Sequence, residues 1–499
     1  MVTDRNSFLS GSVIRGKEAL LTDTFVKKLG YSFALWLAER LRCTPDRMTI
    51  AIGRDARKSG ERLQNAFVAG LTAADCDVLD CGIATTPAMQ MSVEMPEIPA
   101  CGAVMITASA AAEDINGFKL FSPDGALTSS DAASVLERTR DIVVPTRLVR
   151  EFALKDAYTK HLRKAVFEFM GDEVALPLLG LHCVVDASNG AAGFFAELLE
   201  SLGANTRGSF NLEPTGIASH VPTPESDEAL TELSRVVKTE GADLGVMFDP
   251  DGDRVAIVDA SGRAINRNRL IALLSAILLD DEKNLTFVTD SVTSSGLSRF
   301  ITEWGGNHYR YRRGYKNVID EAKRLSDEGF NVQAAIETSG HAALKENYFI
   351  DDGMYLATKV ICEAMWRKRD GLTLSSLIEE LQEPCESIEV RLPIVQDDYR
   401  KAAGYVIEAI LSKTLTNPEW RLASDNREGV RILFSLKGGV DNAWFMLRLS
   451  VHDPVMVINA ESEVSGGLKY VLCQLYAELA RDNEELDLSL LRAKIDQLN

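Results

Sequence analysis

The chain has 499 residues, of which 46% are hydrophobic and 25% are charged, an ordinary balance for a globular protein. One hydrophobic core rarely extends over so long a chain, so we expect several domains. The formal net charge of −19 argues against a nucleic-acid-binding surface, because phosphate backbones require clustered Lys and Arg.

The eight cysteines are scattered and form no CxxC pair, which favours reduced thiols over a disulfide framework or a zinc site. The N-terminus lacks the apolar segment of a signal peptide. No stretch reaches about 18 uninterrupted apolar residues, the length that a membrane span requires. We therefore expect a cytoplasmic protein that binds neither nucleic acid nor membranes.

One pattern recurs along the chain: an apolar strand, a polar turn, an amphipathic helix and a second strand. It is found in residues 48–82, 181–208 and 285–314. Such units predict parallel strands joined by right-handed crossovers. From about residue 387 onward, β-rich stretches and two amphipathic helices predict a different, smaller α+β domain. The sequence thus predicts three similar α/β domains at 1–152, 153–265 and 266–384, followed by an α+β domain at 385–499.

Isolated cations lie in two glycine-flanked turns of the first predicted domain. Arg15 is found in Ser10-Gly11-Ser12-Val13-Ile14-Arg15-Gly16, and two more arginines in Gly53-Arg54-Asp55-Ala56-Arg57. Such turns are usually just solvated. They nevertheless offer a way for an acidic protein to concentrate positive charge at one place.

A serine and a lysine follow the apolar strand at residues 102–106. Thr107-Ala108-Ser109 comes directly after it, and Lys119 ends the later segment Asn116-Gly117-Phe118-Lys119. Open α/β sheets bind ligands at the carboxyl ends of their strands, although a serine there is more often a helix cap. Lys119 could return to the same site as a proton shuttle or a phosphate contact.

Three carboxylates alternate in Asp249-Pro250-Asp251-Gly252-Asp253-Arg254, directly after the apolar strand at 244–248. They can converge on one hard cation, and oxygen ligands favour Mg²⁺. Arg254 places a planar cation beside them that suits a phosphate. A solvated acidic turn or an EF-hand fragment is the alternative. An EF-hand requires a Glu about seven residues after the last Asp, and flanking helices instead of strands.

Two further polar segments are candidate binding loops. Glu337-Thr338-Ser339-Gly340-His341 follows an apolar run and offers donors and acceptors for sugar hydroxyls. Arg448-Leu449-Ser450-Val451-His452-Asp453-Pro454 could form a phosphate cup, although an ordinary turn explains it nearly as well.

Together these motifs resemble those of the α-D-phosphohexomutase superfamily, and within it the phosphomannomutase/phosphoglucomutase group. In that family a Thr-Ala-Ser-His-Asn-Pro loop carries a phosphoserine, an Asp-x-Asp-Gly-Asp-Arg loop binds the metal, and a Gly-Glu-x-Ser-Gly-His loop binds the sugar. The segments at 107–109, 249–254 and 337–341 match these loops, with Ile336 in place of the first Gly. Residues 52–59, Thr86-Pro87, Arg15 and Gly314-Tyr315-Lys316 extend the resemblance over nearly the whole chain.

The resemblance implies three related mixed-sheet α/β domains and a smaller α+β domain around a central cleft. It further implies an isomerase that interconverts hexose 1-phosphate and hexose 6-phosphate of mannose, glucose or both. A phosphoserine would donate its phosphoryl group, and a hexose bisphosphate intermediate would return the other. The implied residues are Ser109, Lys119, His341 and Arg15 for catalysis; Asp249, Asp251, Asp253 and Ser109 for one Mg²⁺ per chain; and Arg254, Lys316, Glu337, Ser339, Arg448, Ser450 and His452 for the substrate.

The resemblance also implies a hexose 1,6-bisphosphate activator and a chain that acts as a monomer or homodimer. The sequence departs from the family pattern in two loops. Ala110-Ala111-Ala112 stands where the family has His-Asn-Pro, and Val451-His452-Asp453-Pro454 replaces a usual Gly-Thr-Glu-Pro. The second departure affects the residues that would hold the phosphate.

Three alternatives stay open. Phosphoglucosamine mutases usually read Glu-Gln-Ser in the sugar loop, and Thr338 supports neither group. The missing His-Asn-Pro would fit a catalytically impaired paralogue that binds sugar phosphates. A phosphatase-type loop would instead use Asp249 as an aspartyl nucleophile.

Overall fold

The computed structural model describes residues 5–138, 147–171, 174–450, 453–482 and 485–498. Its contacts divide the chain into two compact units, Met1–Leu270 with Ser339–Leu377, and Ile271–Thr338 with Ile378–Asn499. The first unit is therefore discontinuous in sequence. The chain leaves it after Leu270 and returns to it at Ser339.

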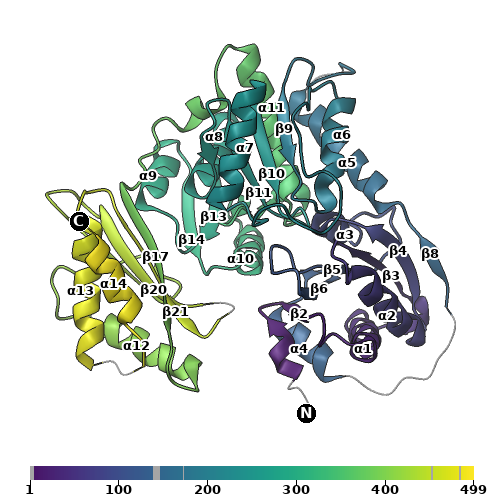
Figure 1. The fold of residues 1–499 in the computed structure, drawn as a ribbon, viewed down its shortest axis with the longest axis horizontal. Helices are drawn as coiled ribbons and strands as arrows, with labels where there is room; N and C mark the ends of the chain where they lie inside the picture. Colours follow the sequence, from purple (N-terminus) through teal and green to yellow (C-terminus); the bar gives the residue numbers. More distant parts are fainter. Residues whose placement is uncertain (1–4, 139–146, 172–173, 451–452, 483–484, 499) are drawn as a thin grey trace. The chain divides into compact units, whose positions relative to one another are not determined.

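The N-terminal sheet of the first unit is mixed (Figure 1). Its central strand β3 pairs in parallel with β4 and β5, whereas β6 pairs antiparallel with β5 and β2. In sheet order the strands are β1 (Leu9–Ser10), β2 (Val13–Lys17), β6 (Ile115–Ser122), β5 (Gly102–Ile106), β3 (Thr49–Arg54), β4 (Asp77–Ile83) and β8 (Val149–Glu151), with β7 (Gly125–Ala126) beside β6.

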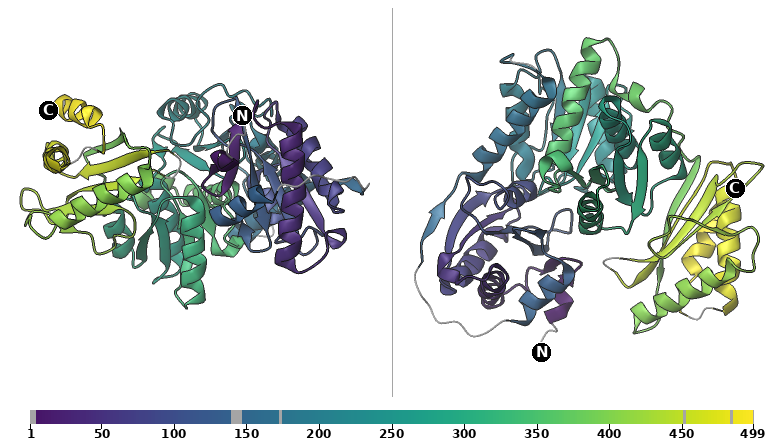
Figure 2. Two further views of the ribbon diagram at one scale, coloured as in Figure 1. Left: turned by 90° about the horizontal axis from the view of Figure 1, so that it is seen from below. Right: turned by 180° about the vertical axis from the view of Figure 1, so that it is seen from behind.

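Helices complete the core of this sheet (Figure 2). Phe67 of α2 packs against Phe33 of α1 and against Phe118 of β6, and all three side chains are fully buried. The two helices approach closely at Gly70, where an added Cβ would lie 2.1 Å from the carbonyl oxygen of Lys27. The helices of this region are α1 (Asp23–Leu41), α2 (Gly60–Ala73), α3 (Thr86–Met91) and α4 (Ser129–Glu137).

The second sheet of the first unit has the order β12-β11-β10-β9. Strands β9 and β10 are parallel, whereas β10 and β11 form an antiparallel hairpin in which Phe248 pairs with Val255. Helix α7 packs on this hairpin, and α11 packs on α5 and β11. The elements are α5 (Leu154–Met170), β9 (Cys183–Asp186), α6 (Phe194–Ser201), α7 (Asp227–Glu240), β10 (Leu244–Phe248), β11 (Val255–Asp259), β12 (Ala264–Ile265), β16 (Ala342–Leu344) and α11 (Gly353–Arg369).

The second unit contains three parallel strands in the order β14-β13-β15 and a separate antiparallel sheet in the order β17-β21-β20-β19-β18. The elements around the parallel strands are α8 (Asn268–Asp281), which begins before the unit boundary, β13 (Thr286–Asp290), α9 (Ser295–Glu303), β14 (Asn307–Tyr311), α10 (Tyr315–Asp327) and β15 (Val332–Ile336). The C-terminal elements are β17 (Glu386–Pro393), α12 (Tyr399–Lys413), β18 (Arg421–Leu422), β19 (Val430–Phe434), β20 (Ala443–Leu449), β21 (Val455–Ser462), α13 (Gly467–Asp482) and α14 (Ser489–Gln497).

The prediction of α/β regions with mixed sheets and a C-terminal α+β region is confirmed. The prediction of two C-terminal helices is wrong, because the short helix α14 adds a third, which buries Leu491 and Ile495 in the same core. The domain boundaries and the central cleft stay predictions.

All eight cysteines are free thiols. Within the described residues, no helix has the length and apolar character needed to cross a membrane.

Candidate active site

The acidic loop connects the two strands of the β10–β11 hairpin. Asp249, Asp251 and Asp253 are completely buried, and one oxygen of each lies within 4.8 Å of the others. Gly252 has a φ of +75°, which lets the chain turn tightly enough to aim alternate side chains inward. The hairpin therefore places three carboxylates at one point, as the sequence pattern predicts.

Two carboxylate oxygens of this loop suit a divalent cation. Oδ1 of Asp251 and Oδ1 of Asp253 are buried and have no hydrogen-bond partner. Leaving such atoms unsatisfied costs about 1–3 kcal/mol each, and more when they are charged. Hard oxygen donors grouped in this way suit Mg²⁺. The residues present therefore fit a divalent cation.

Two cationic side chains partly neutralise the carboxylates. Nζ of Lys119, on β6, donates to Oδ2 of Asp251 at 2.7 Å and also to Oδ2 of Asp253. Nε of Arg254 donates to Oδ2 of Asp249 at 2.9 Å. Burial raises the pKa of Asp249 to about 7 although Arg254 opposes the shift, whereas Lys119 outweighs burial and lowers the pKa of Asp251.

Ser109 lies directly beside this loop. Its hydroxyl Oγ donates to Oδ2 of Asp249 at 2.7 Å and accepts from Nη2 of Arg254 at 2.6 Å. It follows the buried strand β5 by three residues and has a φ of +52°, a left-handed conformation that is strained for a serine. The serine loop and the acidic loop, predicted separately, meet at this hydroxyl.

His341 lies on the other side of the acidic loop. Its Nδ1 lies 2.7 Å from Oδ2 of Asp351 and 3.8 Å from Oδ1 of Asp253. Burial opposes the charged imidazole, but the two carboxylates outweigh it and raise the pKa of His341 to about 9. The two carboxylates therefore favour the charged imidazole, a form that can donate a proton. Ser339, two residues before it, is buried.

Arg15 lies on β2, opposite Gly117 of the neighbouring strand β6, which also carries Lys119.

Two contacts of the first unit were not predicted from the sequence. Asp351 was missed although it stands in an Asp-Asp pair before α11, and Thr86 donates to Oδ2 of Asp251 at 2.5 Å.

The predicted substrate residues Lys316, Glu337, Arg448 and Ser450 belong to the second unit. Oε1 of Glu337 accepts from the backbone N–H of Gly314 at 2.6 Å, so two of the predicted loops meet there. Lys316 forms an ion pair with Asp320 on its own helix. The sugar loop itself spans the division between the units, because Ser339 and His341 belong to the first.

The predicted phosphate loop begins on β20, which carries Arg448, and continues beyond the end of that strand. Arg448 is buried, and burial together with Arg313 lowers its pKa. The backbone N–H of Ser450 donates to the carbonyl of Val455 at 2.9 Å and closes the turn. His452 lies outside the described residues.

Three polar residues near Arg448 were not predicted from the sequence: Asp290, Arg313 and Glu428. Asp290 is fully buried, and burial raises its pKa although Arg313, whose Nε lies 4.0 Å from Oδ2, opposes the shift. Oε2 of Glu428 accepts from the backbone N–H of Arg313 at 3.0 Å.

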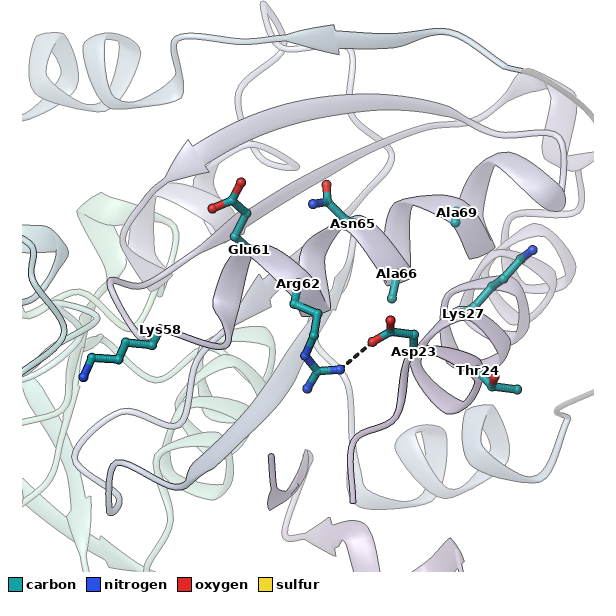
Figure 3. Close-up of a pocket in the computed structure, with 9 residues that line it drawn as sticks. All are labelled: Asp23, Thr24, Lys27, Lys58, Glu61, Arg62, Asn65, Ala66 and Ala69. Carbon is teal, nitrogen blue, oxygen red and sulfur yellow. Dashed lines mark hydrogen bonds and ion pairs between the residues drawn. The ribbon is translucent and has the colours of Figure 1, made fainter. Parts of the chain in front are cut away.

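A large surface hollow elsewhere in the first unit has a different character. It lies between α1 and α2, measures about 690 Å³ and is lined by charges of both signs, including Lys27, Lys58 and Glu61 (Figure 3). Arg62 points across it to Asp23, as an ion pair. None of the predicted site residues lines it.

Three regions of the chain match the family described as phosphoglucomutase/phosphomannomutase. Its α/β/α domain I matches residues 9–142, domain II matches residues 156–262 and domain III matches residues 266–385. The three matches follow one another in chain order and include the serine loop, the acidic loop and the sugar loop.

Two bacterial relatives extend the comparison. A phosphomannomutase/phosphoglucomutase of Pseudomonas syringae pv. tomato is 29% identical over 444 residues, covering 88% of each chain. A phosphoglucosamine mutase of Xanthobacter autotrophicus is 30% identical over 395 residues, covering 77% of this chain and 83% of the relative.

Solved structures share the fold. A phosphoglucomutase/phosphomannomutase family protein from Burkholderia thailandensis matches with a TM-score of 0.79 and 22% identity, over 96% of this chain and 99% of that one. An Aspergillus fumigatus N-acetylphosphoglucosamine mutase, solved with GlcNAc-6P and magnesium, matches with a TM-score of 0.56 and 13% identity, over 95% of each chain.

Fold, site and relatives together define a mutase-type isomerase of the phosphohexomutase class. The chain belongs to the phosphoglucomutase/phosphomannomutase family, within the α-D-phosphohexomutase superfamily. The family resemblance stated from the sequence is therefore confirmed.

Proposed function

We propose that this enzyme interconverts hexose 1-phosphate and hexose 6-phosphate, of mannose, glucose or both, through a phosphoserine at Ser109. The observation that carries the proposal is the placement of the Ser109 hydroxyl between Asp249 and Arg254, at 2.7 and 2.6 Å. A helix-capping serine would not require a buried carboxylate and a guanidinium on its hydroxyl. A group that exchanges a phosphoryl requires both a cation and a proton acceptor.

The proposed reaction has two balanced half-reactions. A substrate hydroxyl attacks phosphoserine phosphorus, the bond between phosphorus and Oγ breaks, and Arg254 stabilises the charge that develops on Oγ. The resulting hexose bisphosphate turns round, and Oγ of Ser109 then attacks its other phosphorus. The bond between that phosphorus and the sugar oxygen breaks, and the product is released. The attacking hydroxyl must pass its proton to a neutral side chain and the departing sugar oxygen must gain one, and Lys119 and His341 are the candidates for these two transfers.

Asp249, Asp251 and Asp253 would hold Mg²⁺ together with Ser109. Bound there, the metal would supply positive charge against the phosphoryl oxygens. We further propose Arg254, Lys316, Glu337, Ser339, Arg448, Ser450 and His452 as substrate contacts, and Arg15 as an arginine that faces the substrate. A hexose 1,6-bisphosphate activator, a cytoplasmic location and a monomeric or homodimeric state belong to the same proposal.

A coupled mutase assay tests this function. Purified protein is given glucose 1-phosphate or mannose 1-phosphate with Mg²⁺ and a trace of the matching 1,6-bisphosphate. We expect turnover that EDTA abolishes and that Ser109→Ala lowers by at least about a thousandfold. Mass spectrometry should find phosphate on Ser109; phosphate on Asp249 would instead identify a phosphatase-type aspartyl nucleophile and contradict the proposal.

Phosphoglucosamine mutase is the second candidate, because one relative with that name is 30% identical to this chain. Glucosamine 1-phosphate is therefore included in the same assay as a third substrate. A kcat/KM for glucosamine 1-phosphate above those for glucose and mannose 1-phosphate would favour this candidate.

An impaired, sugar-phosphate-binding paralogue is the remaining alternative, motivated by Ala110, Ala111 and Ala112. The variant Ala110→His discriminates between the two possibilities. We expect it to match the parent within about tenfold, well below the hundredfold or more that a lost catalytic imidazole would cost. Activity that arises only in the variant would support the paralogue.

A further inference from the structure

The backbone that follows Ser109 is held by one side chain. Nη2 of Arg57 donates to the carbonyl oxygens of Ser109 at 2.6 Å and Ala111 at 2.7 Å. Nη1 donates to those of Ala112 at 2.8 Å and Ile115 at 3.0 Å. All four acceptors are main-chain atoms, so these contacts do not depend on which side chains occupy positions 110 to 112.

Asp55 fixes the orientation of this arginine. Its Oδ1 accepts from the backbone N–H of Arg57 at 3.0 Å, and its Oδ2 lies 3.4 Å from Nε of Arg57. Oδ2 also accepts from the Thr107 hydroxyl at 2.7 Å, and that hydroxyl accepts from the N–H of Ser109 at 2.8 Å. The network therefore binds both the backbone N–H and the backbone carbonyl of Ser109.

Packing of the loop's own side chains contributes little to its conformation. Ala110 and Ala111 are only partly buried, Ala112 is exposed, and all three line a hollow of about 320 Å³. The left-handed φ of Ser109 is strained, and such a conformation persists only when its surroundings impose it. Arg57 is 8% exposed and Asp55 is fully buried, and the hydrogen bond from Arg57 to the carbonyl of Ser109 is itself buried.

We propose that Arg57 is the positioning residue that holds the Ser109 loop in its reactive conformation, through contacts that do not involve the side chains at positions 110 to 112. It acts through the main chain and touches neither the substrate nor the Ser109 hydroxyl. The inference rests on the proposed mutase function, because the loop it positions carries the proposed phosphoserine.

The first test is kinetic and uses Arg57→Lys, which keeps the charge but loses the planar fork. We expect kcat to fall on the order of a hundredfold, the usual effect of misplacing a reacting group by about 1 Å. KM should change by less than about threefold, because substrate contacts are unaffected. Arg62→Lys is the matched control, since Arg62 forms an exposed ion pair with Asp23, and it should leave both constants unchanged.

The second test does not require activity. Hydrogen–deuterium exchange in Arg57→Lys should rise at least about tenfold for the amides of residues 108–116 and stay unchanged in 244–259. Asp55→Asn, which keeps the arginine but weakens its support, should act in the same direction and serves if Arg57→Lys does not fold.

Unchanged exchange and kcat in a folded Arg57→Lys would overturn the inference, as would a rise spread evenly over the first unit. Faster loop exchange in Arg57→Lys, combined with no mutase activity in the parent, would instead support the positioning role of Arg57 and overturn the proposed reaction.

Discussion

Lys119 and Arg254 are internal counter-ions for three buried carboxylates. Lys119 is 5% exposed and contacts Asp251 and Asp253, which are completely buried. Taking charges out of water is costly unless each finds a partner. These two cations therefore let the acidic loop fold around its own charges.

Replacing Lys119 by Met should reveal this role. We expect the variant to lose about 3–5 kcal/mol of unfolding free energy in EDTA, because two buried carboxylates are left without their cation. Mg²⁺ should recover part of the loss by binding the native state. Urea unfolding followed by circular dichroism, with and without Mg²⁺, measures both effects.

Lys164→Met is the control for this experiment, because the Lys164 side chain is 74% exposed in its ion pair with Glu168. It should change the unfolding free energy by less than about 0.5 kcal/mol under either condition. Equal losses for the two variants would contradict the counter-ion role of Lys119.

At the scale of elements, the turn before β16 places His341 by bringing two backbones close together. Gly340 has a φ of +94°, and an added Cβ would lie 2.6 Å from the carbonyl oxygen of Val255, on β11. His341 follows at once and forms a β-bridge with Arg254. The position of the imidazole therefore depends on this close approach.

The substitution Gly340→Ala should cost about 1–3 kcal/mol of stability and reduce mutase activity by displacing His341. Gly371→Ala provides the comparison, since Gly371 also has a positive φ, +72°, but nothing within 4 Å of its Cβ position. Chemical unfolding and kcat are measured for both. Activity retained in Gly340→Ala would mean that His341 tolerates the shift.

His308 links three elements of the second unit. It lies on β14, with Nε2 at 2.7 Å from the hydroxyl of Thr289 on β13 and Nδ1 at 2.6 Å from that of Ser298 on α9. Burial, and then the positive charges of Arg310 and Arg431, hold the pKa of His308 well below its usual range. The native protein therefore keeps this imidazole neutral in mild acid.

The contribution of His308 to stability should consequently fall as the pH drops below about 6.5, because its imidazole takes up a proton in the unfolded chain but not in the native protein. The limiting slope for one group is about 1.4 kcal/mol per pH unit. His308→Gln cannot titrate and lacks this contribution, so the parent should lose stability relative to the variant between pH 6.5 and 5. Parallel profiles for parent and variant would show that His308 is protonated in the fold.

Local patterns predicted the elements well because a strand, its turn and the next helix are encoded within about ten to fifteen residues. The acidic loop was predictable for the same reason. The contacts of Arg57 with the Ser109 loop were not predictable, because Arg57 and Ser109 are 52 positions apart and the acceptors are carbonyl groups that every residue possesses. Asp351 was missed because only the fold brings it to His341, and helix α14 because its apolar face is short.

At the scale of the whole molecule, the division into two compact units predicts how the protein unfolds. Trp36 is buried in the first unit and Trp444 in the second. Units with separate cores often lose structure independently. We expect different midpoints, by tryptophan fluorescence in urea, from two variants whose other tryptophans are replaced by Phe. One keeps only Trp36 and Trp366, in the first unit, and the other keeps only Trp304, Trp420 and Trp444, in the second. Coinciding transitions would show that the units unfold as one.

The interruption of the first unit in sequence has a consequence for how the protein is made. Ribosomes deliver Ser109 and the acidic loop long before His341, Asp351 and helix α11, which belong to the same unit but follow residues 271–338. Until α11 emerges, the apolar surface that it covers on α5 and β11 stays uncovered on the nascent chain. Slow or interrupted translation in this interval therefore prolongs the time for which the incomplete first unit exposes apolar surface. Such surface promotes aggregation and is the kind that chaperones bind.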